Sequence, residues 1–147
     1  MILGASSRVL NGTILNKHEM PWLTPVFYSN YKNVVNPACT GSIIGKYHVL
    51  TAAHCYNAGW VGTGVHKRSE VVSFNKVVKW NIAPGVDIAV ITLEDEIEFK
   101  PGVVEKAKLA SPCESCCPTC SKNCDIDLTA AGWGRDPSDP GTRTFFL

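Results

Sequence analysis

Residues 50–55 read LTAAHC and follow directly on the apolar stretch SIIGKYHV at 42–49. Within this region the short apolar stretches GSIIG at 41–45 and VLTAA at 49–53 favour β-strands, because they contain β-branched residues and a turn-forming glycine separates them. Other short stretches rich in Val, Ile, Thr and aromatic residues occur at 26–29, 70–80 and 87–93. No segment keeps a helical period with caps, and only 51–58 fits a single helical turn. Short strands at close spacing predict an all-β antiparallel barrel or sandwich.

Composition limits the classes of function. The 147 residues carry a formal net charge of +1 at pH 7, and 45% of them are hydrophobic. This is ordinary for one globular domain with a buried core. The balanced charge lacks the positive field that binds nucleic acids and anionic membranes, so we expect neither partner. No apolar run approaches the roughly 20 residues of a membrane-spanning helix, and the first residues lack a signal-peptide pattern.

Three short motifs occur in a characteristic order: LTAAHC at 50–55, DIAVITL at 87–93 and AGWGR at 131–135. Together they resemble the chymotrypsin/trypsin family of serine proteases (peptidase S1), from Arg8 to the end of the chain. The resemblance implies a trypsin-like antiparallel β-barrel, the first of the family's two, with the second largely missing. We expect a leader remnant at 1–8, the first barrel at 9–110, a cysteine-rich linker insert at 111–125 and a truncated second barrel at 126–147.

In this family a histidine takes the proton of a serine nucleophile, and an aspartate holds the imidazole in the correct tautomer. The resemblance implies that His54 is the general base and Asp87 its orienting residue. Because Asp87 directly precedes the apolar run 88–93, we also expect its carboxylate in an apolar neighbourhood. There a histidine partner would offset the cost of an unpaired charge.

The resemblance implies two further features. One is a Cys39–Cys55 disulfide beside the histidine. The other is an activation site in RVLNG at 8–12, where cleavage after Arg8 frees the amino group of Val9.

Alternative interpretations stay open for the site residues. A histidine is more often a surface or core residue than a catalyst, and Asp87 could instead cap the turn after APG at 83–85. Asp95 is a weaker candidate for the orienting residue, because it lies in the charged run EDE. Trp133 and Gly134 are interpreted as residues of the fold rather than of the site.

The family's nucleophile has no counterpart here, because no Gly-Asp-Ser-Gly-Gly block occurs in the 147 residues. Ser42 lies within an expected strand, so we assign it to packing or sheet hydrogen bonding. Without a serine to activate, the base has no partner, and we expect the chain as written to be inactive. We interpret it as part of a secreted endopeptidase acting on peptides or proteins. The alternative is a pseudoprotease that binds an inhibitor or partner protein.

Five of the seven cysteines lie in the linker insert, at Cys113, Cys116, Cys117, Cys120 and Cys124. So many cysteines indicate an oxidising compartment, and we expect disulfides in a secreted, extracellular protein. Adjacent cysteines rarely meet the geometry of a bridge, so Cys116 and Cys117 need different partners. Two abutting C-x2-C pairs could instead bind zinc, but known zinc sites separate such pairs by a longer loop. We therefore expect no metal and no cofactor.

Overall fold

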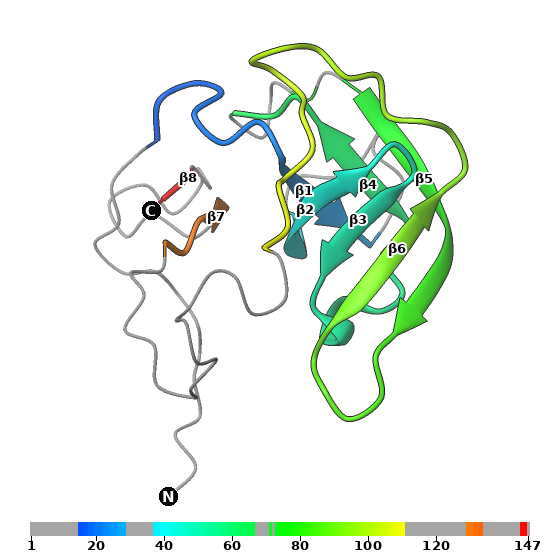
Figure 1. The fold of residues 1–147 in the computed structure, drawn as a ribbon. Coiled ribbons are helices and arrows are strands. Elements are labelled where there is room, and N and C mark those ends of the chain that lie inside the picture. Colours follow the sequence, from blue (N-terminus) through cyan, green and yellow to red (C-terminus); the bar gives the residue numbers. More distant parts are fainter. Residues whose placement is uncertain are drawn as a thin grey trace, which may run out of the picture.

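The computed structural model describes residues 15–28, 37–66, 71, 73–110, 129–133 and 145–146. Its strands are β1 (Leu23–Phe27), β2 (Cys39–Gly45), β3 (His48–Thr51), β4 (Trp60–Thr63), β5 (Ser73–Ile82), β6 (Ala89–Leu93), β7 (Gly132–Trp133) and β8 (Phe145–Phe146). The first six close into an antiparallel barrel in the order β1-β2-β3-β6-β5-β4, and β7 pairs with β8 beside it (Figure 1). The predicted all-β class is confirmed, and the architecture is a barrel rather than a sandwich.

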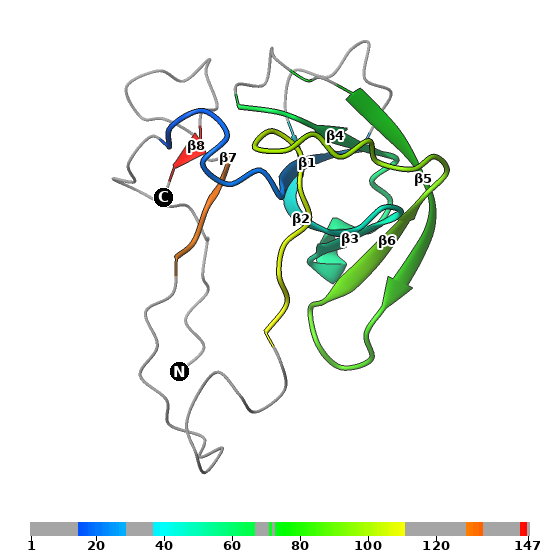
Figure 2. The same ribbon diagram turned by 45° about the horizontal axis from the view of Figure 1, so that its top comes forward.

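The barrel encloses a core of aliphatic side chains. Strand β6 shows why, because Ala89, Ile91 and Leu93 are buried while the residues between them are only half-buried. This alternation is the period of two that a strand imposes on its side chains. Four other strands of the barrel contribute fully buried residues to the same core, at Val26, Ile43, Val49 and Val61. Strand β1 pairs with both β2 and β4, which completes the ring of strands seen in Figure 2.

The pairing of β3 with β6 determines where the expected site residues lie. The two strands run antiparallel, with Thr51 opposite Ala89 at the last pair of the ladder. The end of β3 and the start of β6 therefore meet at the same end of the barrel. His54 follows Thr51 closely along the chain and Asp87 shortly precedes Ala89, so this register brings both residues to one place.

A second apolar cluster lies where β7 packs against β1 and β2. Leu15, Leu23, Val65 and Trp133 are buried together there. Gly132 permits the close approach, since a Cβ at this position would lie only 2.7 Å from Thr40 Oγ1. Trp133 thus belongs to the fold, as interpreted from the sequence.

Several predictions fall outside the described residues: the activation site at Arg8 and Val9, the five cysteines between 113 and 124, and Gly134. All barrel strands lie within the expected 9–110, and the domain limits themselves stay predictions. In the described part of the chain, no helix is both long and apolar enough to cross a membrane.

Gly41 in β2 offers a test of barrel packing. A Cβ there would lie 2.6 Å from Val49 Cγ1 and 3.1 Å from the carbonyl oxygen of Leu50. We expect Gly41→Ala to lower the free energy of unfolding by about 1–3 kcal/mol, because β3 must shift to admit the methyl group. Urea unfolding followed by circular dichroism measures the loss. Gly45→Ala in the same strand is the control, since its Cβ would approach His48 only to 3.7 Å; equal losses would contradict the argument.

Candidate active site

The histidine lies on a single helical turn directly after β3. This turn is the 3-10 helix η2 (Ala53–Cys55). The N–H of Cys55 donates to the carbonyl of Ala52 at 3.2 Å, and the N–H of Tyr56 donates to that of Ala53 at 3.0 Å. The two small alanines let the chain turn tightly at the end of the strand. The turn lies within the 51–58 segment for which the sequence predicts it.

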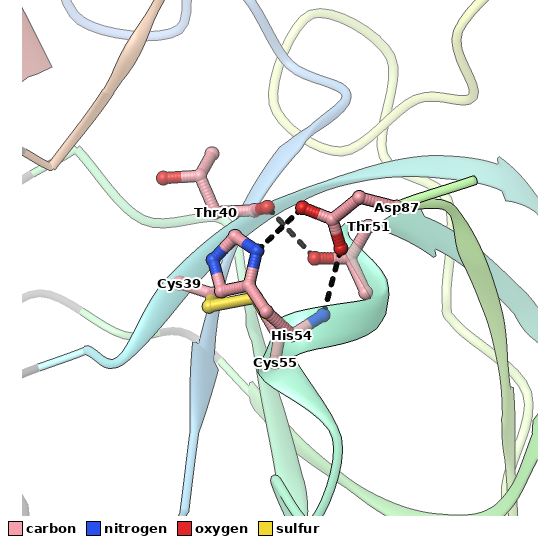
Figure 3. Close-up of a disulfide and its surroundings, with 6 residues drawn as sticks. All are labelled: Cys39, Thr40, Thr51, His54, Cys55 and Asp87. Atoms are coloured by element: carbon pink, nitrogen blue, oxygen red, sulfur yellow. Dashed lines mark hydrogen bonds and ion pairs between the residues drawn. A yellow bond between two sulfur atoms is a disulfide. The ribbon is translucent and has the colours of Figure 1, made fainter. Parts of the chain in front are cut away.

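Two links tie this turn and the end of β3 before it to β2. A disulfide joins Cys39, the first residue of β2, to Cys55, the last residue of η2. This is the pair that the resemblance implies, and it lies beside His54 in Figure 3. The hydroxyl of Thr51 also donates to the carbonyl of Thr40 at 3.0 Å. This second link was not predicted, although a buried threonine in a barrel strand needs a partner for its hydroxyl.

His54 and Asp87 are joined by two hydrogen bonds (Figure 3). The imidazole Nδ1 lies 2.7 Å from Asp87 Oδ2. The backbone N–H of His54 donates to Asp87 Oδ1 at 2.8 Å. An ionised carboxylate only accepts hydrogen bonds, so Nδ1 carries a proton, and in the neutral imidazole the lone pair is then on Nε2. The backbone bond was not predicted, because a main-chain donor leaves no mark in the sequence.

These bonds also hold Asp87 in its charged form. The hydrogen bond from the His54 side chain, followed by that from the His54 backbone, lowers the pKa of Asp87 below its ordinary value of 3.8. Partial loss of hydration acts in the opposite direction but is smaller. Asp87 is therefore ionised at neutral pH and accepts both bonds.

The expected apolar burial of Asp87 was wrong. The side chains of His54 and Asp87 are 70% and 59% exposed, and the adjacent Val86 and Ile88 are exposed as well. Asp87 lies in the loop 83–88 between β5 and β6, beyond the last ladder pair of Ile82 with Ala89. Both side chains of the pair face solvent, so hydrogen bonds rather than burial position the carboxylate.

The other candidates lie elsewhere or have a different role. Asp95 is exposed after the opposite end of β6, so it is not the partner of the histidine. The sulfur atoms of Cys39 and Cys55 and a ring nitrogen of His54 lie within 4.8 Å of one another. As a disulfide, the two sulfurs offer no thiolate to a metal ion.

Known proteins resemble this chain in sequence and in fold. The family model for trypsin matches residues 9–144. Melanization protease 1 of Drosophila melanogaster is 43% identical over 61 residues, which cover 40% of this chain and 15% of that protein. Kallikrein-4 of Homo sapiens is 24% identical over 151 residues, covering 91% of this chain and 52% of that protein. The chain therefore spans about half, or less, of the length of these relatives.

A solved structure supports the same fold. Neuropsin, a serine protease expressed in the limbic system of mouse brain, matches with a TM-score of 0.71 at 21% identity. The match covers 94% of this chain and 62% of the neuropsin chain. Since the trypsin model also matches nearly all of these residues in sequence, the chain belongs to the trypsin family of serine proteases.

Proposed function

We propose that this chain carries the histidine and aspartate of a serine endopeptidase active site, with His54 as general base and Asp87 as its orienting residue. The double hydrogen bond between them supports this proposal. With Nδ1 protonated and held by the carboxylate, Nε2 is the nitrogen that can take a proton from a hydroxyl nucleophile. The imidazolium that forms is then stabilised by the negative charge 2.7 Å from Nδ1.

The same mechanism requires a serine nucleophile and oxyanion donors, which a Gly-Asp-Ser-Gly-Gly block supplies in the family that this chain resembles. The 147 residues contain no such block. Ser42 sits mid-strand in β2, opposite Leu23 on one side and Leu50 on the other. A nucleophile normally lies in a sharp, exposed turn instead. We therefore propose that proteolysis is the activity of a longer parent protein and that these residues alone hydrolyse no peptide bond.

Substrate and location follow from the same proposal. A serine endopeptidase acts on peptides or proteins, and the Cys39–Cys55 disulfide fits an oxidising, extracellular compartment. We also propose that cleavage after Arg8 activates the parent protein by freeing the amino group of Val9. N-terminal sequencing of the mature protein tests this, and a mature chain that still contains Arg8 would contradict it.

The pKa of Asp87 tests the pairing. We expect the folded chain to show an Asp87 pKa below 3.8, and His54→Ala to raise it partway, because the backbone bond survives. Since the pKa is lower in the folded state, the stabilisation is complete above 3.8 and is lost as the pH falls through the folded value. Carboxyl chemical shifts followed against pH measure the pKa. His48→Ala, an exposed site on β3, is the control, and an unchanged pKa in His54→Ala would contradict the pairing.

The inactivity of the 147-residue chain is tested with a serine-reactive fluorophosphonate. We expect no covalent label and no hydrolysis of peptide substrates, because the base has no serine to activate. Labelling that disappears after the protein is heated would reveal a folded nucleophile and overturn this prediction.

The parent protein is tested by sequencing the native transcript through its 3′ end and by the intact mass of the product. We expect the reading frame to continue into a Gly-Asp-Ser-Gly-Gly block. In that longer protein, His54→Ala should lower kcat by about 10⁶-fold and Asp87→Asn by about 10⁴-fold, while His48→Ala leaves it unchanged. A stop codon after Leu147, with a mass near 16.0 kDa, would overturn the protease proposal and favour a binding role.

A further inference from the structure

The disulfide and the histidine form a compact cluster of three possible metal ligands. The sulfurs of Cys39 and Cys55 and a ring nitrogen of His54 lie within 4.8 Å of one another. In Figure 3 the imidazole lies between the disulfide and Asp87. We propose that reduction of the Cys39–Cys55 disulfide creates a site for Zn²⁺, formed by two thiolates and the imidazole. This inference does not depend on the proposed protease function.

The positions of the three residues suit tetrahedral zinc. Zinc binds thiolate sulfur at about 2.3 Å and imidazole nitrogen at about 2.0–2.1 Å, which separates the ligand atoms by about 3.5–3.8 Å. The ligand atoms already lie within 4.8 Å, so side-chain rotations can complete the geometry. The backbone need not move far, because the Cα atoms of the two cysteines are 6.2 Å apart. A water molecule would occupy the fourth position, as in zinc sites with three protein ligands.

Asp87 supplies the outer contact that such a site requires. A histidine bound to a metal usually donates its other ring N–H to a carboxylate, which fixes the orientation of the ring and makes it a better ligand. The Nδ1 atom of His54 makes this contact with Asp87 at 2.7 Å, which leaves Nε2 for the metal. Nε2 is also the proton acceptor in the proposed protease mechanism, so bound zinc would block the base.

The chemistry balances when a phosphine is the reductant. The phosphine gives two electrons to the disulfide and takes an oxygen atom from water to become a phosphine oxide. The two protons of that water go to the sulfurs, which leave as two thiols. Zinc then displaces both thiol protons into solvent. A dithiol can supply the same two electrons and two protons, and is itself oxidised to a disulfide.

The test uses the full chain, with serine in place of the cysteines at 113, 116, 117, 120 and 124 so that they cannot compete for metal. Protein reduced with a phosphine is titrated with Co²⁺, whose visible absorption reports tetrahedral thiolate coordination, and the bound Co²⁺ is then displaced with Zn²⁺. We expect one ion per chain in the reduced protein and none in the oxidised protein. Asp87→Asn should weaken binding about 10–100-fold and His54→Ala at least as much, with no effect from His48→Ala.

Two results would overturn the proposal. The first is equal Co²⁺ binding by oxidised and reduced protein. The second is an affinity unaffected by His54→Ala or by Asp87→Asn. Circular dichroism shows whether the barrel survives reduction. An unfolded chain could still bind Co²⁺ through its cysteines, but Asp87 lies far along the sequence from Cys55. In an unfolded chain, Asp87→Asn would therefore leave the Co²⁺ affinity unchanged. A negative result would leave the protease proposal intact, because that proposal is tested with the disulfide formed.

Discussion

The ladder between β3 and β6 is the constraint on which the arrangement of the site depends. Its register places Thr51 opposite Ala89, and the residues just beyond this pair are those that meet as His54 and Asp87. A shift by one residue would turn every side chain of a strand to the other face. A shift of β3 would remove the fully buried Val49 from the core, and a shift of β6 would remove the fully buried Ile91. Burial of these aliphatic side chains therefore fixes the geometry of a polar site that contains none of them.

The two hydrogen bonds on Asp87 have different consequences. The pair is largely exposed, so solvent screens its charges and it adds little to the stability of the barrel. The effect of the pair is to orient the carboxylate and the imidazole relative to each other. The backbone N–H of His54 belongs to a turn that the disulfide joins to β2, and the Thr51 bond joins the end of β3 before this turn to β2 as well. This N–H therefore fixes one oxygen of the carboxylate independently of the imidazole. The other oxygen is then in place to select the ring orientation and the tautomer.

The sequence predicts the strands and the two site residues better than it predicts their surroundings. Alternating apolar residues identify β6, but closure of β1 on β4 leaves no local pattern. The strand pattern alone therefore fits either a barrel or a sandwich, and only the family resemblance favours the barrel. The position of Asp87 before an apolar strand shows where β6 begins. It does not show whether other residues cover the turn, and for this reason the expected burial was wrong. The backbone donor to Asp87 could not be predicted at all, because every residue except proline has one.

The order His54-Cys55 in the chain has a structural reason. A 3-10 helix has three residues per turn, so successive side chains point about 120° apart. Within η2 this rotation leaves Cys55 only 1% exposed, where it bonds to β2, and leaves the His54 side chain 70% exposed, where it meets Asp87. One short turn thus directs two adjacent side chains to different surroundings: Cys55 links the turn to β2, and His54 is available for chemistry. The same turn places the sulfur of Cys55 close to the imidazole of His54. For this reason, reduction of the disulfide would change what His54 can bind.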